Sequence, residues 1–184
     1  MSSNSSPSFR RDCFIDPGAG AAQAAHARHT LRLLLAQDGS TTRLCEAVAA
    51  GPITLQVLHQ APVTEVPAIV REALPGDRFI ERITSLAAHG EVMMDNLTYI
   101  ALQGLDVSLQ RELEAGQVPI GHLLSRLWVR RESVPASPAL QQRLWSSVGA
   151  PDPAATRAYR IVTPEGPRML IAESYRRGML MQRG

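Results

Sequence analysis

Two charged residues lie on otherwise apolar faces of predicted strands, and the first is a glutamate. In the segment 168–175, alternation along a strand places Glu173 on the same face as Ile171 and Tyr175. A carboxylate there either reaches water at the end of a sheet or is buried with a partner. A third possibility is a proton donor in a pocket, because apolar surroundings disfavour the charged form. The pattern by itself favours the two structural explanations.

The second charged residue is Arg82, in a predicted strand over 78–88. It shares a face with Ile80, Thr84 and Leu86. Such a face is either the solvated side of an antiparallel sheet or the wall of a cavity. In a cavity, arginine suits a carboxylate ligand because its planar guanidinium can donate two parallel hydrogen bonds. The pattern leaves both interpretations open.

Other catalytic motifs are missing from the sequence. It has no CxxC, HExxH or GxSxG motif and no glycine-rich phosphate loop. The five histidines show no metal-ligand spacing, and two cysteines, Cys13 and Cys45, form no disulfide framework. We therefore expect neither a metal site nor a cofactor.

Length and composition favour one globular domain. The chain has 184 residues, of which 45% are hydrophobic and 20% charged, and its net charge is +2. This charge is too balanced for a nucleic-acid-binding domain, and no apolar run approaches the roughly 20 residues that span a membrane. We expect a cytoplasmic protein, monomeric or a small homo-oligomer, whose partner is a small molecule.

The first half of the chain divides into a tail, two helices and three strands. Residues 1–20 are rich in Ser, Pro and Gly, which predicts a flexible tail before a single domain over 21–184. Alternation in the first strand places Ile53, Leu55, Val57 and His59 on one face. The connection 61–76 contains several prolines and a glycine, and a short helix is possible within it. The predicted elements are helices over 21–37 and 41–50, strands over 53–59, 78–88 and 92–102, and a hairpin turn at 89–91.

The second half predicts three more helices and two strands. A helix begins at Asp106 or Ser108 and stops at Gly116, and Pro119 opens another that runs to about Val129. The charged residues 130–132 then read as a solvated cluster at a helix end. A helix over 138–149 interrupts an irregular stretch, and strands follow over 158–163 and 168–175. Because no regular strand–helix alternation appears, we predict an α+β fold with an antiparallel sheet.

Four segments, in consistent order between about Leu31 and Tyr175, carry a family resemblance. They resemble segments of the chorismate pyruvate-lyases, which are 4-hydroxybenzoate synthases, although that family often has Phe at the position of Tyr175. The segments are LLLAQDGSTTR (33–43), RITSLAAHGE (82–91), GQVPIGHLL (116–124), and a closing hairpin from YRIV (159–162) to IAESY (171–175).

The resemblance implies both a fold and a site. The family fold is an antiparallel sheet with surrounding helices that enclose a ligand cavity under helix-turn-helix flaps. The family's carboxylate-binding arginine falls on Arg82, and its acid at the ring hydroxyl falls on Glu173. Its two backbone N–H donors fall on Ser40 and Ile120.

The implied reaction eliminates pyruvate from chorismate and leaves 4-hydroxybenzoate. Arg82 and the amides of Ser40 and Ile120 would fix the ring carboxylate, while a protonated Glu173 would act as general acid. Aromatisation drives the reaction, so no cofactor is implied. Two other functions remain open: an effector-sensing module that binds an aromatic acid without turnover, and a related lyase in secondary metabolism.

Overall fold

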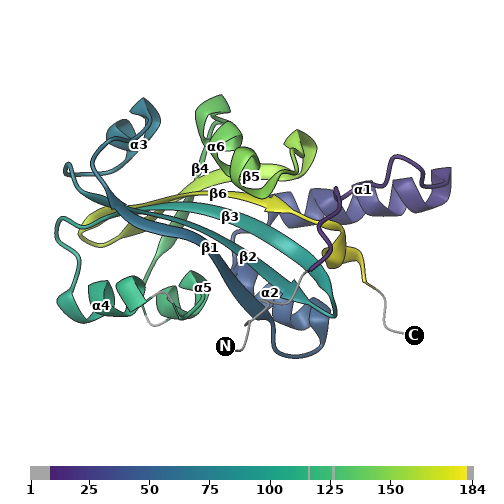
Figure 1. The fold of residues 1–184 in the computed structure, drawn as a ribbon, viewed down its shortest axis with the longest axis horizontal. Coiled ribbons are helices and arrows are strands. Elements are labelled where there is room, and N and C mark those ends of the chain that lie inside the picture. The colour runs from purple at the N-terminus through teal and green to yellow at the C-terminus, as the bar shows by residue number, and fades with distance from the viewer. Residues whose placement is uncertain (1–8, 116, 126, 182–184) are drawn as a thin grey trace, which may run out of the picture.

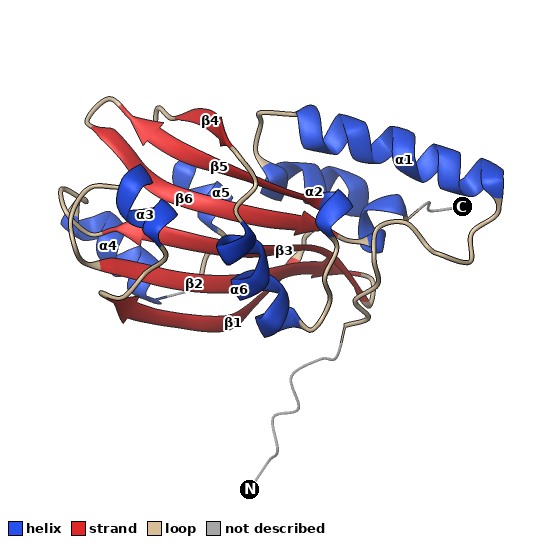
Figure 2. Cartoon of the chain, turned by 90° about the horizontal axis from the view of Figure 1, so that it is seen from above, coloured by secondary structure: helices blue, strands red, loops and turns tan. Residues whose placement is uncertain are grey.

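The computed structural model describes residues 9–115, 117–125 and 127–181, and its centre is one antiparallel sheet. The strand order is β1-β2-β3-β6-β5-β4, and every neighbouring pair is antiparallel (Figures 1 and 2). The α+β prediction is therefore confirmed. The strands are β1 (Thr54–Val63), β2 (Phe79–Ala88), β3 (Glu91–Ala101), β4 (Arg130–Val134), β5 (Thr156–Thr163) and β6 (Gly166–Tyr175).

Helices cover both faces of this sheet (Figure 1). α3 and α6 pack on one face, where Val70 and Leu144 meet Ile83 and Leu97. α2, α4 and α5 lie on the other, where Leu113 and the α5 leucines meet the sheet. The helices are α1 (Ala21–Ala36), α2 (Thr41–Ala49), α3 (Ala68–Ala73), α4 (Val107–Ala115), α5 (Ile120–Leu124) and α6 (Pro138–Val148), with short 3-10 turns at Pro153–Ala155 and Arg177–Leu180.

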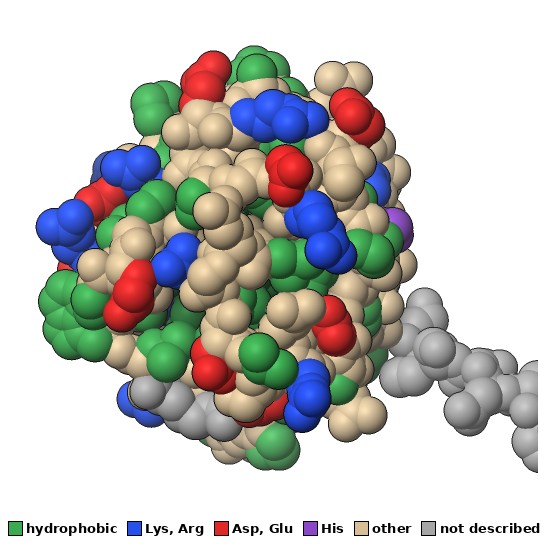
Figure 3. Space-filling view, turned by 90° about the vertical axis from the view of Figure 1, so that its left-hand side faces the viewer, with side chains coloured by type: hydrophobic (Ala, Val, Ile, Leu, Met, Phe, Trp, Pro, Cys, Tyr) green, Lys and Arg blue, Asp and Glu red, His purple; other side chains and the backbone are tan. Residues whose placement is uncertain are grey.

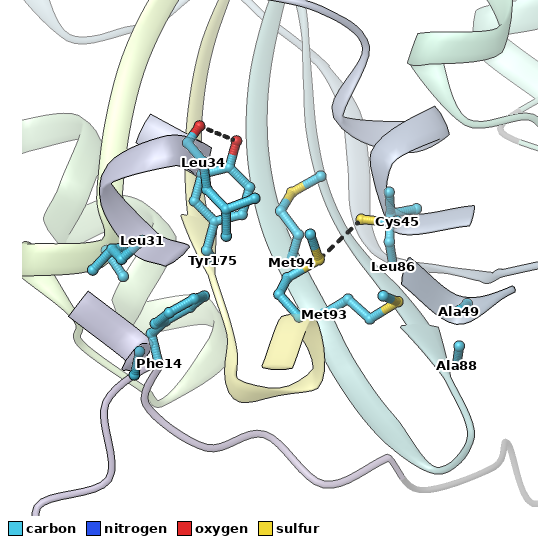
Figure 4. Close-up of a cluster of buried hydrophobic side chains, with 13 residues drawn as sticks. Phe14, Leu31, Leu34, Cys45, Ala49, Leu86, Ala88, Met93, Met94 and Tyr175 are labelled. Carbon is cyan, nitrogen blue, oxygen red and sulfur yellow. Dashed lines mark hydrogen bonds between the residues drawn. The ribbon is translucent and has the colours of Figure 1, made fainter. Parts of the chain in front are cut away.

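α1 extends along one end of the sheet and closes a third apolar cluster. Leu31 and Leu34 of α1 pack with Phe14 near Tyr175, and Cys45 of α2 lies against Met179 (Figure 4). These contacts attach the segment before α1 and the segment after β6 to the same end of the sheet.

The segment before α1 differs from the prediction of a flexible tail. Phe14 is fully buried, and Arg10 exchanges backbone hydrogen bonds of 2.8 Å with Gly90 and Val92. Arg11 donates to the buried Asp95 at 3.1 Å. Residues 9–20 are thus part of the folded domain, because they supply an apolar anchor and a counter-charge. The rest of that prediction, residues 1–8, lies outside the described residues.

Three local predictions also need correction. The charged cluster at 130–132 belongs to β4, an edge strand held by pairing with β5 rather than by an apolar pattern. α5 ends at Leu124, well before Val129. A β-bulge after Val57 turns His59 away from the Leu55 face, so His59 lies 3.3 Å from Glu81 instead. Gly116, the predicted end of the preceding helix, is outside the described residues.

Among the other elements, β1 continues to Val63, four residues beyond its predicted end and into the predicted connection 61–76, whereas the remaining boundaries agree within about two residues. The turn after β2 is made by His89 and Gly90, both at positive φ (52° and 82°), as two-residue hairpins require. On the face shown in Figure 3, acidic and basic side chains are interspersed with apolar ones and form no large area of one charge.

Replacing Asp95 tests the polar cluster that locks both chain ends to the sheet. Asp95 and Arg176 are fully buried, and Arg176 Nε donates to the carboxylate at 2.7 Å. We expect Asp95→Asn to lower the free energy of unfolding by about 3–5 kcal/mol, because two guanidinium groups lose their counter-charge. Glu91→Gln, which breaks the exposed pair with Arg10, should cost less than about 1 kcal/mol. Equal losses in urea unfolding would contradict this account.

Candidate functional site

A cavity lies between the sheet and the helices α2 and α5. Thr41 and Thr42 of α2 and Ile120 of α5 line it from above, and Glu173 and Tyr159 line it from the sheet. Its free volume is about 40 Å³, a measure in which roughly 10–15 Å³ suffices for one water molecule. The predicted cavity is therefore present, and it is small.

Glu173 is fully buried at the wall of this cavity. Arg157 binds its Oε1 atom through Nε at 2.8 Å and Nη2 at 2.7 Å. Thr41 also donates to Oε1, and Tyr159 donates to Oε2, each at 3.0 Å. The Tyr175 hydroxyl lies 3.0 Å from Oε1 and 3.1 Å from the Leu34 carbonyl, so its single proton serves one of them at a time (Figure 4). These donors favour the carboxylate over the protonated acid proposed from the sequence.

Arg157 connects this carboxylate to the end of α1. Its Nη1 donates to the carbonyls of Leu35, at 3.1 Å, and Gln37, at 2.5 Å. Its guanidinium also lies 5.2 Å from the ring centre of Tyr159, a cation–π distance. Burial would lower the pKa of Arg157, but the Glu173 carboxylate more than offsets this and raises it. The pair is thus a fixed positive and negative charge inside the protein.

The two tyrosines beside Glu173 stay protonated. Burial first, and then the negative charge of Glu173, raise the pKa of both Tyr159 and Tyr175 far above the ordinary value. Both phenols therefore keep their protons near neutral pH, where Tyr159 donates to the carboxylate and Tyr175 donates either to it or to the Leu34 carbonyl.

Arg82 is also buried, which excludes the solvated outer face. It lies on the same sheet face as Glu173, since Arg82 pairs with Thr98 and Thr98 pairs with Ile171. Its Nη2 donates to the Val118 carbonyl at 3.1 Å, beneath the loop that leads into α5. Burial lowers its pKa, so a bound anion would offset part of the cost of removing this cation from water.

Ser40 and Ile120 meet where α2 and α5 begin. Ser40 caps α2 by accepting from the Arg43 amide at 3.4 Å, and Ile120 is the first residue of α5. Gly121 allows the contact, because a Cβ there would lie 2.2 Å from Thr42 Oγ1 and 3.0 Å from Ser40 Oγ. Of the four predicted site residues, Glu173 and Ile120 line the cavity, whereas Arg82 and Ser40 are not among its lining residues.

The sequence did not predict the positions of two arginines near the cavity. Arg157 pairs directly with Glu173 only because a bulge between Ile161 and Val162 shifts the register of the hairpin. Regular pairing outward from Thr163 and Gly166 would place Thr156 opposite Glu173 instead. Arg131 reaches the cavity from β4, the strand that the sequence did not reveal. Counting outward from the hairpin turn predicts that Glu173 pairs with either Thr156 or Arg157, and it does not decide between them.

The site is therefore a buried carboxylate-and-arginine cavity in an α+β domain. Glu173 can accept a hydrogen bond from the cavity side, and the buried Arg82 lies on the same face of the sheet. The described residues contain no group of three His, Cys, Asp or Glu side chains that could hold a metal ion. Nor does any helix in the described part of the chain have the length and apolarity to cross a membrane.

Comparison with known proteins identifies the family. The model of the chorismate pyruvate-lyase Rv2949c-like family matches residues 35–181, so the chain belongs to this family. No curated protein matches the chain.

Solved structures with a similar fold include bacterial regulators. One is the C-terminal domain of a histidine utilization repressor from Pseudomonas syringae, with 9% identity over 72% of this chain and 97% of that one and a TM-score of 0.47. Another is a GntR-family transcriptional regulator from Bacillus cereus, with 10% identity over 72% and 96% and a TM-score of 0.42. At such values, no role of these proteins transfers to the chain.

Ultraviolet titration tests the burial of the tyrosines. The sequence has three tyrosines, and burial raises the pKa of each, including Tyr99. We expect no phenolate absorbance near pH 10 in the folded protein, whereas the protein in urea should titrate there. Because the unfolded state releases these protons first, stability should fall as pH rises above about 10. A native titration near pH 10 would show that the phenols are open to solvent.

Replacing Gly121 tests the close contact of α2 and α5. Gly121→Ala should lower the free energy of unfolding by about 1–3 kcal/mol, because Thr42 must move to admit the methyl group. Gly51→Ala is the matched control, since nothing lies within 4 Å of a Cβ there. If the two variants melt alike, α2 and α5 are not packed as described.

Proposed function

We propose that this protein is a chorismate lyase that eliminates pyruvate from chorismate and releases 4-hydroxybenzoate. The observation that carries the proposal is the buried Glu173 at the cavity wall, on the same sheet face as the buried Arg82. Membership of the chorismate pyruvate-lyase Rv2949c-like family supports it.

In this proposal, the ring carboxylate binds at the Arg82 end of the cavity. The Arg82 guanidinium supplies the charge, and the backbone amides of Ser40 and Ile120 supply further donors. The contact of Gly121 with Thr42 and Ser40 brings these two amides close together. The para hydroxyl of the ring then points toward Glu173.

Glu173 acts as a hydrogen-bond acceptor for that hydroxyl in its carboxylate form. Its Oε2 atom accepts from Tyr159, which leaves room for a second donor on the cavity side. As the carbon–oxygen bond to the ether breaks, its electron pair leaves with the enolpyruvate. The ring loses the proton of its hydroxyl-bearing carbon and becomes aromatic, and the enolpyruvate gains one proton to become pyruvate. The site contributes mainly position and a water-poor environment.

For the substrate to enter, the helices that cover the cavity, α2 and α5, must move. Chorismate has 16 heavy atoms, far more than a space of about 40 Å³ admits. α2 and α5, with nine and five residues, are the short elements above it. We expect these two helices to separate when the ligand enters.

A domain that binds an aromatic hydroxy-acid without turnover is the second candidate function. The same contacts favour it in one respect: Glu173 is already paired with Arg157, at 2.7 Å and 2.8 Å, as a binding residue would be. Turnover distinguishes this function from the lyase.

Incubation with chorismate tests the proposal directly. We expect 4-hydroxybenzoate and pyruvate in equal amounts without added metal, and a fall in kcat of roughly 10²–10⁴-fold for Glu173→Gln. Glu165→Gln, an exposed acid in the β5–β6 turn, should leave kcat unchanged. Arg82→Gln should weaken 4-hydroxybenzoate binding by roughly ten- to a hundredfold.

Two results would overturn the lyase proposal. Saturable binding of 4-hydroxybenzoate without turnover would establish the binding domain instead. Full turnover by Glu173→Gln would remove Glu173 from the chemistry. Because that variant leaves the buried Arg157 without its carboxylate, its melting curve must be recorded beside its kinetics.

A further inference from the structure

Arg131 stands between the cavity and a second hollow at the edge of the sheet. This second hollow, the edge cleft, has a volume of about 300 Å³ and is lined by Gln37, Asp38, Ser133 and Arg157 among others. Arg131 and Tyr159 line both the cavity and the edge cleft. The two spaces are therefore separated by these two side chains.

The position of Arg131 is set by the sheet. It pairs with Ile161 across β4 and β5, so it shares the face that carries Tyr159 and Arg157. Its Nη1 donates to the Asp38 carbonyl at 3.1 Å, which holds the guanidinium against the turn between α1 and α2. Arg130 and Glu132 point to the opposite face, where they pair with each other.

Arg131 brings a positive charge that its surroundings leave uncompensated. Its buried Nε has no hydrogen-bond partner among the described residues, and none of their acidic side chains forms an ion pair with it. Glu173 is already paired with Arg157. Asp38 is exposed and gives Arg131 its carbonyl oxygen. A guanidinium with a spare buried donor at a cavity wall is a site for a carboxylate.

The chemistry of the proposed substrate places a second carboxylate there. Chorismate has one carboxylate on the ring and one on the enolpyruvyl group, and the ether carbon adjoins the carbon that bears the hydroxyl. With that hydroxyl at Glu173, the enolpyruvyl group must lie at the Glu173 end of the cavity. Tyr159 and Arg131 line the cavity on that side, from β5 and β4, whereas Arg82 belongs to β2, which lies beyond β6 and β3 in the sheet.

We propose that Arg131 binds the enolpyruvyl carboxylate of the substrate and directs that group toward the edge cleft, through which pyruvate leaves. This inference rests on the proposed lyase function. Two arginines, Arg82 and Arg131, then match the two carboxylates of chorismate, whereas 4-hydroxybenzoate needs Arg82 alone. The edge cleft is wide enough for a three-carbon acid, and Arg157 adds a second positive charge to its wall.

Arg131→Gln separates the two carboxylates. We expect it to raise the KM for chorismate by roughly ten- to a hundredfold, which is what the loss of one charged hydrogen bond predicts. It should leave the Kd of 4-hydroxybenzoate within about threefold, because the product lacks the second carboxylate. Inhibition by added pyruvate should weaken by a factor similar to the change in KM. Arg131→Lys, which keeps the charge, should recover part of the loss.

Arg130→Gln is the matched control on the same strand, and it should change neither constant. A Kd for 4-hydroxybenzoate that weakens as much as the KM for chorismate would overturn the inference, since Arg131 would then serve the site generally. An unchanged KM would also overturn it while the lyase function stands. Absence of turnover and of chorismate binding in the wild-type protein would overturn the lyase function itself, and this inference with it.

Discussion

The buried ion pair between Glu173 and Arg157 is the interaction on which the site depends. Both charges lose water on folding, and such a pair is stable only when its remaining hydrogen-bonding atoms also find partners. Here the partners come from separate parts of the chain: the Thr41 hydroxyl from α2, the Tyr159 phenol from β5 and two carbonyls from the end of α1. The pair therefore joins the sheet to the helices above it, and no element of the cavity is positioned independently.

The Glu173–Arg157 pair holds one part of the helical cover of the cavity in place and leaves another part able to move. The end of α1 is held by Arg157 and by contact of the Leu34 carbonyl with Tyr175. α5 is a single short helix that meets α2 across Gly121, and its other contact with α2, between His122 and Glu46 at 2.9 Å, is partly exposed. Opening the cavity at α5 disturbs fewer buried polar groups than opening it at α1. A ligand therefore gains entry at lowest cost between α2 and α5.

Alternation along the strands was enough to predict an antiparallel sheet without β4 and to place Arg82 and Glu173 on largely apolar faces, but it left open whether those faces were buried. Two β-bulges determine side-chain positions that this alternation does not predict. The bulge in β5 places Arg157 rather than Thr156 opposite Glu173, and the bulge in β1 reverses His59. Both depend on pairing energies along whole strands, which a local pattern does not contain. β4 escaped detection because its charged residues lack an apolar alternation, so its formation and the placement of Arg131 depend on β5.

The two faces of the sheet carry different kinds of polar cluster. On the α6 side, Asp95 holds Arg11 and Arg176, which precede α1 and follow β6, and its side chain does not line the cavity. On the other side, the Glu173 pair balances its own charge and leaves Arg82 and Arg131 as the cations near the cavity. In the proposed lyase, each of these two cations would bind one carboxylate of chorismate, while Glu173 accepts a hydrogen bond from the ring hydroxyl. Because 4-hydroxybenzoate keeps only one carboxylate, the proposal implies that the product is bound less tightly than the substrate.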